Sequence, residues 1–464
     1  MKDDGARYAL GEACLMMTDL MMTEEERRSV KTCETENIAK ALMVQMLGPF
    51  EIQNPASIQH VAYRARIMFH DLLRKEPVAR RMRKYKGFDF EREFCRITGI
   101  SLHNWLTLML GFHAYFVHYH DKNGTTRRPE FLTLDRIVFR KDTPIDQNEL
   151  DRVLNSVSTT VEDFKVALQG TGPVDWRFDS VPFRNKPLIQ LQPGKFHCFD
   201  LGLLVEKIHS GVYWTIHEGL PGAERPNLSG AWGILFEEYV NWFLGDRTFK
   251  DLLFWPFPKW SDGNECFDGA LMRNSVLIPM EYKGGFLRRA ARYSGDRNLL
   301  EKELQSKVVC GCKQLARKIE RLFSRDRRTR RSLRDIPLEH VTRIVPVLVV
   351  QDHILDGPLI NWHINNRFNE ILDRSLLRTT VSVDALTVVG VRELETMADS
   401  AEMGIFDLFG GLQTRCYLDP EMRSNLHNFL LDRPGYGDGI SPRIRGVIDS
   451  LFDDVAEHLF GKHR

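Results

Sequence analysis

The sequence has few of the features that mark membrane, secreted or repetitive proteins. Its 464 residues contain no apolar run near the roughly 18 residues that a membrane-spanning helix needs. No secretory signal opens the chain, and neither an internal repeat nor a low-complexity block is present. A composition of 43% hydrophobic and 27% charged residues excludes wholesale disorder. We therefore expect a cytoplasmic globular protein of two or three domains with no membrane partner.

Cysteine is scattered rather than grouped. The chain has eight cysteines, and the closest two, Cys310 and Cys312, lack both the CxxC spacing and a second pair. This distribution argues against a zinc site and against a disulfide framework. It predicts reduced thiols, as in a cytoplasmic protein.

The net charge of +1 conceals an uneven distribution. Residues 284–335 contain 16 Lys or Arg against six Asp or Glu, whereas the rest of the chain contains 48 against 57. A concentrated basic segment suits a polyanionic partner such as a nucleic acid. A solvated basic helix has the same composition, so both interpretations stay open.

The residues best suited to chemistry lie between positions 264 and 285, in NECFDGALMRNSVLIPMEYKGG. Two strand-like runs, ECFDGALM and SVLIPMEYK, meet at Arg273 and Asn274, which predicts a β-hairpin. Because side chains alternate along a strand, Glu281 and Lys283 share one face. An acid is therefore expected beside an ammonium group.

The register of this hairpin decides whether a third group joins them. A two-residue turn at 273–274 places Asp268 opposite Pro279 and diagonal to Glu281, whereas an odd-length loop turns it away. Two converging carboxylates suit a divalent cation that activates water for phosphodiester hydrolysis, and Lys283 can position that water. An exposed Glu–Lys pair on a half-buried strand is the alternative. Pro279 also requires a bulge or an unpaired side of its strand.

The surrounding pattern predicts an α/β domain with a mixed sheet flanked by helices. A buried helix, AWGILFEEYVNWFLG, carries Glu237 and Glu238 on opposite flanks of its apolar stripe, and geometry does not choose between them. Further strands are expected at DLLFWPF, RIVPVLVV and DALTVVGV, with helices over 296–325 and at INWHINNRFNEILDRSL.

The remaining parts of the chain are expected to be mainly helical. Residues 1–226 are expected to form a region for recognition or partner binding. It should contain a short strand at FLTLDRIVF and a strand pair at PLIQL and FHCFD. Residues 396–464 predict a helical C-terminal extension that includes SPRIRGVIDSLFDDVAEHLF.

Taken in order, these residues resemble the PD-(D/E)XK nuclease superfamily, which has the restriction-endonuclease-like fold. The resemblance covers roughly residues 227–395. The matching positions are the Gly233-x-x-Phe236-Glu237 helix motif, Asp268 in FDG, Glu281 and Lys283 in E-Y-K, and Gln314 on the following helix.

The resemblance implies a role for each of these side chains. Asp268 and Glu281 look like the ligands of Mg²⁺ or Mn²⁺, and Lys283 like the residue that orients or activates water. Glu237 resembles the helix acid that reaches the metal, and Gln314 a polar helix residue of the exonuclease-like branches. Three clustered acids repel one another, so raised carboxylate pKa values are expected without a cation.

The implied activity is hydrolysis of phosphodiester bonds, in DNA rather than RNA, within a bacterial defence or restriction system. A homo-oligomer or a defence-system protein is the expected protein partner. A non-catalytic nucleic-acid-binding or scaffolding protein on the same fold is the alternative. Basic residues that follow the hairpin are expected to contact the nucleic acid, namely Arg288, Arg289, Arg292, Lys307 and Lys318.

Overall fold

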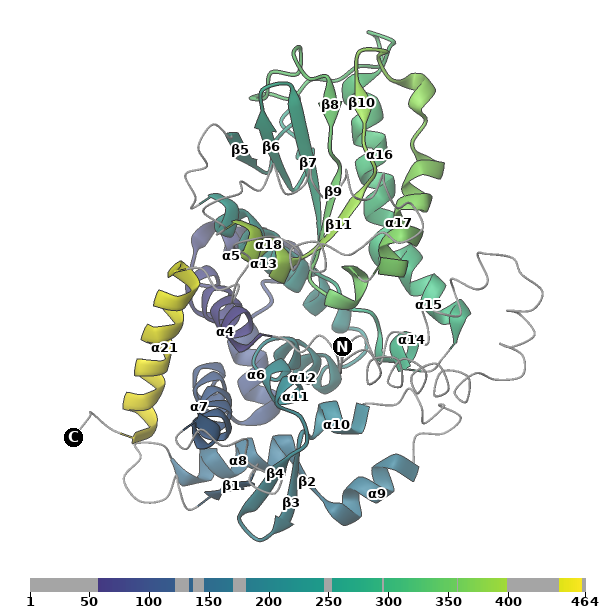
Figure 1. The fold of residues 1–464 in the computed structure, drawn as a ribbon. Coiled ribbons are helices and arrows are strands. Elements are labelled where there is room, and N and C mark those ends of the chain that lie inside the picture. Colours follow the sequence, from purple (N-terminus) through teal and green to yellow (C-terminus); the bar gives the residue numbers. More distant parts are fainter. Residues whose placement is uncertain are drawn as a thin grey trace, which may run out of the picture.

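The computed structural model describes residues 57–121, 133–136, 146–169, 181–245, 253–293, 296–356, 358–398 and 442–460. A large mixed sheet occupies one half of the molecule, and the N-terminal helices occupy the other half together with a smaller sheet (Figure 1). The predicted α/β class with a mixed sheet flanked by helices is confirmed.

In the large sheet, antiparallel strands are joined to parallel ones. Strands β5 (Leu253–Pro256), β6 (Gly269–Arg273) and β7 (Val276–Lys283) form an antiparallel meander. Strands β8 (Arg343–Ile344) and β9 (Val347–Val350) pair in parallel with successive halves of β7, and then with β10 (Ser382–Val383) and β11 (Thr387–Gly390). The strands expected at DLLFWPF, RIVPVLVV and DALTVVGV are therefore present.

The hairpin between β6 and β7 turns one residue later than predicted. Arg273 lies opposite Val276, so the two-residue turn is Asn274-Ser275, and Asn274 has φ 53°. Asparagine tolerates this left-handed conformation, which primed hairpin turns require. Gly269 consequently lies opposite Met280, and the N–H of Asp268 donates to the carbonyl of the same residue.

Pro279 lies within β7 without a bulge. It pairs with Ala270 on one side, whereas on the other side the ladder is interrupted between Ile344 and Val347. Pro346 lies in this interruption. The strand therefore meets the constraint of its proline with an unpaired side, and the parity of the side chains is preserved.

Helices cover both faces of the large sheet. On one face α13 (Arg225–Gly245) packs against Ile278, Met280 and Tyr282 in a single hydrophobic cluster. On the other face α15 (Arg297–Leu304), a π-helical turn (Gln305–Val309) and α16 (Cys310–Phe323) pack against Leu277 and Leu348, together with α17 (Pro358–Ile371). The helix predicted over 296–325 is thus one rod with a π turn near its middle.

The described residues of the N-terminal half are mainly helical. Its sheet has the order β1-β4-β3-β2, in which β3 (Leu188–Gln192) and β4 (Lys195–Cys198) are the expected strand pair. The other two strands are β1 (Thr133–Asp135), within the short strand expected there, and β2 (Ser158–Thr160). The helices are α4 (Ile58–Arg66), α5 (Glu76–Met82), α6 (Phe90–Thr98), α7 (Leu102–Asp121), α8 (Gln147–Val157), α9 (Val161–Gln169), α10 (Val181–Asn185), α11 (Leu201–Glu206) and α12 (Ser210–Gly219).

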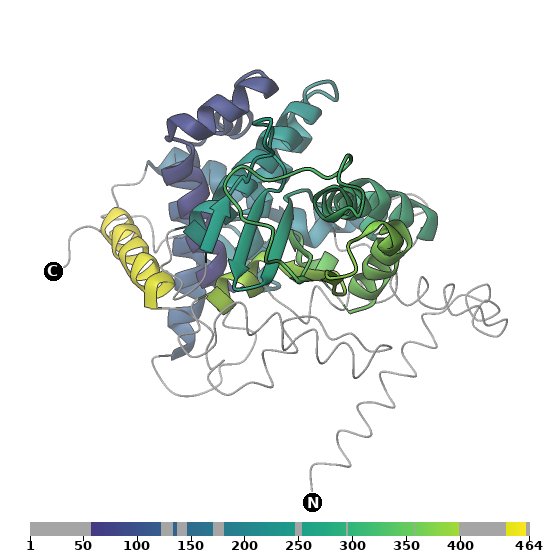
Figure 2. The same cartoon turned by 90° about the horizontal axis from the view of Figure 1, so that it is seen from above.

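Much of the predicted C-terminal extension lies outside the described residues. Helix α21 (Pro442–Phe460) matches the expected C-terminal helix and packs on α4 and α7. It lies on the opposite side of the molecule from α15, α16 and α17 (Figure 2). No helix among the described ranges is long and apolar enough to cross a membrane.

A buried ion pair joins the N-terminal helices to the sheet domain. The guanidinium of Arg64 on α4 donates to both oxygens of Glu395 at 2.9 and 3.0 Å, and Tyr239 on α13 donates to the same carboxylate at 2.6 Å. Glu395 lies on α18 (Val391–Ala398). The domain boundaries predicted at 226/227 and 395/396 thus fall inside α13 and α18.

Candidate active site

Asp268 lies immediately before β6, at the end of the hairpin where β6 begins and β7 finishes. Its N–H donates to the carbonyl of Met280 at 3.1 Å, and its Oδ2 accepts the N–H of Tyr282 at 2.7 Å. The carboxylate therefore takes the place of the next ladder acceptor between the two strands. This holds the side chain at the end of the hairpin, next to the backbone of Glu281.

A buried polar network fixes this position from the α13 side. Asn241 donates to the carbonyl of Asp268 at 2.8 Å and accepts from the hydroxyl of Tyr282 at 3.0 Å. Gly269 makes room for that hydroxyl, because a Cβ there would lie 2.0 Å from it. Such networks specify a single arrangement when every member is paired.

Glu281 is buried on the α16 side of the hairpin, with 1% of its surface exposed. Its Oε1 is bonded to the ammonium of Lys318 on α16, and its Oε2 lies 3.7 Å from the Nζ of Lys283. Burial raises the pKa of Glu281 to about 7, and the negative charge of Asp268 contributes in the same direction against the two lysines. The raised carboxylate pKa expected here is present at Glu281, with burial as its largest cause and the neighbouring acid as the second.

Lys283 reaches from the end of β7 toward α16. Its Nζ donates to the Oε1 of Gln314 at 2.9 Å, and the absence of a side chain at Gly311 leaves room for its methylene groups. Burial lowers the pKa of Lys283, but the carboxylates of Glu281 and Asp268 outweigh burial, so the pKa is raised overall. Lys283 is consequently a positively charged donor at neutral pH.

Glu237 approaches the site from α13, and Glu238 lies beside it. Arg81 on α5 donates to the Oε2 of Glu237 at 2.6 Å and to the Oε1 of Glu238 at 2.8 Å. Burial raises the pKa of Glu237 to about 7, and the charge of Asp268 is the next largest cause. Asp268 thus acts electrostatically on Glu237 as well as on Glu281.

Sequence reasoning did not identify Arg81, which comes from the N-terminal half. Its guanidinium lies between the two α13 glutamates and also stacks 4.1 Å from the ring centroid of Phe257. A guanidinium that bridges two acids partly neutralises them and fixes their orientation. Its sequence context, EPVARRM on a short helix, gives no sign of this contact.

Two of the three carboxylates of the site are paired with cationic side chains. Glu281 is bonded to Lys318 and Glu237 to Arg81. Within the described ranges no three His, Cys, Asp or Glu side chains are grouped so that they could hold one metal ion. The ammonium of Lys318 thus holds one of the two Glu281 oxygens that a divalent cation would use.

Four of the five basic residues predicted to contact a nucleic acid are ion-paired in the structure. Arg288 donates to Glu303 at 2.6 Å, Arg289 bonds Glu218, and Lys318 bonds Glu281. Arg292 is the fourth of these residues and the most deeply buried. Its side chain is only 7% exposed and is bonded to Asp352, where it fixes α14 (Arg289–Tyr293) to the end of β9. A guanidinium buried in this way has no surface from which to bind a phosphate backbone.

Lys307, the fifth of these residues, is half-buried on the π turn. Its Nζ would lie 3.8 Å from a Cβ built at Gly285, just beyond the end of the hairpin. It therefore lies close to the segment that follows Lys283, as a nucleic-acid contact would require.

An exposed basic loop runs beside the site. Arg327 and Arg328 are exposed between α16 and β8. Arg334 N donates to Lys259 O at 2.9 Å, and the loop also bonds the segment around Trp260. That segment precedes Asp268 in the sequence. The basic loop is therefore bonded to the part of the chain that leads to this carboxylate.

Comparison with known proteins gives no relative. No family model, no curated protein and no solved structure matches the chain. The residues and their geometry therefore carry the functional proposal.

Proposed function

We propose that the protein is a metal-dependent nuclease of the PD-(D/E)XK kind that hydrolyses phosphodiester bonds, with DNA as the expected substrate. The observation that carries the proposal is the convergence of Asp268, Glu281 and Lys283 at one end of a hairpin inside a mixed sheet. Strongly perturbed carboxyl groups beside a lysine are a frequent property of catalytic sites.

The donor set fits a hard divalent cation. Asp268 and Glu281 would hold Mg²⁺ or Mn²⁺ through carboxylate oxygens, the ligands that these ions prefer. When bound, such an ion polarises a phosphoryl oxygen and lowers the pKa of a coordinated water. The negative charge of Asp268 raises the pKa of Glu281, so binding of a cation relieves that repulsion.

Lys283 supplies the fixed positive charge. Its contacts with Gln314 and Glu281 restrict the ammonium to the mouth of the site, where it can donate to a phosphate oxygen or orient the attacking water. Gln314, which is exposed on α16, positions Lys283 through its side-chain oxygen. Glu237 and Arg81 complete the α13 side, where the raised pKa of Glu237 allows it to hold or release a proton near neutrality.

The exposed arginines near residues 325–334 are suited to hold the phosphate backbone while the hairpin acts on it. The N-terminal half would then recognise the substrate or a partner. A role in bacterial defence, and a homo-oligomer or defence-system partner, remain predictions from the sequence resemblance.

A cleavage assay tests the proposal. Wild type, Lys283→Met and the control Lys302→Met are incubated with circular and linear, single- and double-stranded DNA and with RNA, each with and without Mg²⁺ or Mn²⁺. Lys302 is an exposed lysine on α15, in the same helical rod. We expect metal-dependent cleavage by wild type and Lys302→Met but not by Lys283→Met. Absence of cleavage by wild type under every condition contradicts the proposal.

A non-catalytic nucleic-acid-binding protein is the second candidate. It is favoured by the pairing of Glu281 with Lys318 and of Glu237 with Arg81, which satisfies these acids without a metal. In that case Arg327→Glu with Arg328→Glu abolishes nucleic-acid binding, whereas Lys283→Met leaves binding unchanged and no variant cleaves.

A further inference from the structure

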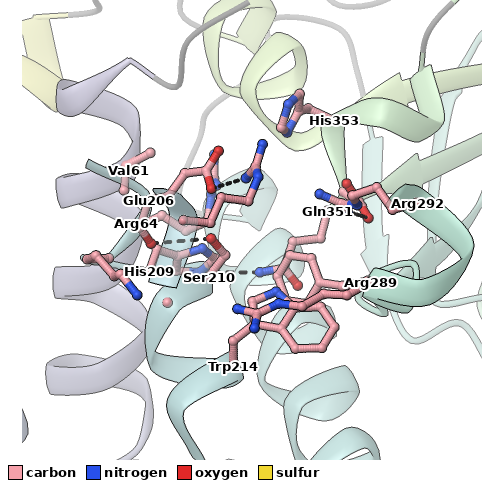
Figure 3. Close-up of a pocket in the computed structure, with 15 residues that line it drawn as sticks. Val61, Arg64, Glu206, His209, Ser210, Trp214, Arg289, Arg292, Gln351 and His353 are labelled. Carbon is pink, nitrogen blue, oxygen red and sulfur yellow. Dashed lines mark hydrogen bonds and ion pairs between the residues drawn. The ribbon is translucent and has the colours of Figure 1, made fainter. Parts of the chain in front are cut away.

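A second charged site lies between the N-terminal helices and the end of β9. It is a cavity of about 80 Å³ bordered by α4, the α11–α12 junction, α14 and the residues after β9 (Figure 3). None of the carboxylate-site residues lines it. The basic side chains that line it are Arg64, Arg184, Lys207, Arg289 and Arg292.

The arginines of this basic pocket all have acidic partners. These partners are Glu395 for Arg64, Glu206 for Arg184, Glu218 for Arg289 and Asp352 for Arg292. Each guanidinium is therefore held in a fixed orientation around the cavity by a bonded carboxylate.

Lys207 differs from the arginines. Its side chain is 8% exposed, and within the described part of the chain its ammonium forms no direct hydrogen bond or ion pair, although the charges of Glu218 and Glu206 act on it. Burial lowers its pKa to about 7, and Arg289 is the next largest cause. An unpaired ammonium at such a position is costly to the folded state. Its presence in a cavity indicates a ligand that supplies the missing negative charge.

The size and lining of the cavity limit that ligand. A cavity volume of about 80 Å³ suits a small ligand such as one tetrahedral oxyanion. The nearby His209 is neutral, because burial lowers its pKa well below the usual value. The Nε2 of His209 lies 3.2 Å from the Nε2 of Gln351. The indole N–H of Trp232 donates to the Oε1 of Gln351 at 2.7 Å.

We propose that the basic pocket binds a phosphate-sized oxyanion, either inorganic phosphate or the phosphate group of a monoester, through the ammonium of Lys207. Arg289, whose guanidinium lies 5.0 Å from the ring centroid of Trp214, supplies a second positive charge at the pocket. The inference does not depend on the nuclease proposal, since the two sites share no lining residue.

The test is binding of inorganic phosphate to the full-length protein in metal-free buffer, by calorimetry and thermal melting. Lys207→Met keeps the length of the side chain and removes its charge, and Lys195→Met, an exposed position on β4, is the matched control. We expect phosphate to bind wild type and Lys195→Met and to raise their melting temperatures. Affinity should fall at least tenfold in Lys207→Met. Equal binding by Lys207→Met, or no binding by wild type at 10 mM phosphate, overturns the proposal.

Two further arms complete the experiment. Arg289→Gln, near the outer side of the pocket, is expected to weaken phosphate binding severalfold, and it provides an independent variant should Lys207→Met fail to fold. Glycerol 3-phosphate is then titrated against the phosphate complex. Displacement assigns the pocket to phosphate monoesters, whereas phosphate binding without displacement assigns it to the free oxyanion. If neither Lys207→Met nor Arg289→Gln changes phosphate binding, the proposed site is wrong.

Discussion

The carboxylate site and the basic pocket lie at the ends of adjacent parallel strands but differ in charge. The two strands are linked where Gln351, which lines the basic pocket, donates its N–H to the carbonyl of Lys283 at 3.1 Å. In the carboxylate site burial raises the pKa of Glu281, whereas in the basic pocket it lowers the pKa of Lys207. The same desolvation thus destabilises opposite charges, and only Lys207 lacks a partner among the described residues. We therefore assign catalysis to the paired charges of the carboxylate site and ligand binding to the unpaired ammonium of Lys207.

The largest effect is expected from the carboxylate site. If the proposed chemistry is correct, Lys283→Met and Asp268→Asn each reduce cleavage by about 10³-fold or more, since the first removes a charge that acts on the reacting phosphate and the second removes a metal ligand. Initial rates on the best substrate, with circular dichroism as the check on folding, measure this effect. Rates within tenfold of wild type would place the chemistry elsewhere, and Lys302→Met should behave as wild type.

The basic pocket should show the reverse behaviour, because removing its charge stabilises the protein. The pKa of Lys207 falls from 10.5 to about 7 on folding. At 1.36 kcal/mol per unit, this corresponds to a destabilisation of about 4 to 5 kcal/mol at pH 7. Lys207→Met is expected to recover most of that free energy in urea unfolding without phosphate, whereas Lys195→Met recovers none.

The sign of the pH dependence sharpens this prediction. Between pH 7 and 10.5 the unfolded chain binds one more proton at Lys207 than the folded chain does, so the stability of wild type rises with pH across this window. The destabilisation caused by the buried Lys207 ammonium is fully present below pH 7. The stability gap between Lys207→Met and wild type should therefore close as pH approaches 10.5. A constant gap would show that the substitution acts through packing rather than through the ammonium.

Much of the sheet domain could be predicted because its signals are local. The apolar run around Val347, the paired strands before Glu281 and the buried α13 sequence each specify their own element. The turn was misplaced by one residue, because both Arg273-Asn274 and Asn274-Ser275 are compatible with a polar two-residue loop. The left-handed conformation of Asn274 favours the second.

The charge partners could not be predicted in the same way. Arg81 contacts Glu237 from 156 residues away, and nothing in its own segment differs from a solvated helix. Arg292 was expected at a surface because it lies in the basic segment after the hairpin. It is instead buried and bonded to Asp352. Composition reports how many charges a segment carries, but only tertiary packing decides which of them are neutralised.

Metal binding is expected to stabilise the carboxylate site by a smaller amount. Mg²⁺ or Mn²⁺ at ten times its dissociation constant contributes about 1.4 kcal/mol, because it binds the folded state alone. Thermal melting with and without millimolar metal measures this shift, and Asp268→Asn should abolish it while Lys207→Met should not. A wild-type melting temperature indifferent to metal would instead favour the non-catalytic candidate, in which Lys318 and Arg81 already satisfy the acids.

The smallest effect is expected at Pro279, on the strand that links the two sites. Its ring faces the interruption between β8 and β9, so Pro279→Ala removes no ladder hydrogen bond. Because alanine also leaves the unfolded chain freer, we expect a loss of about 0.5 to 1 kcal/mol in urea unfolding. Cleavage and phosphate binding should change by less than twofold, since side-chain charges define both sites. Loss of either activity at constant fold would mean that the interrupted pairing of β7 positions Lys283 and Gln351 together, and the two sites would then have to be treated as one.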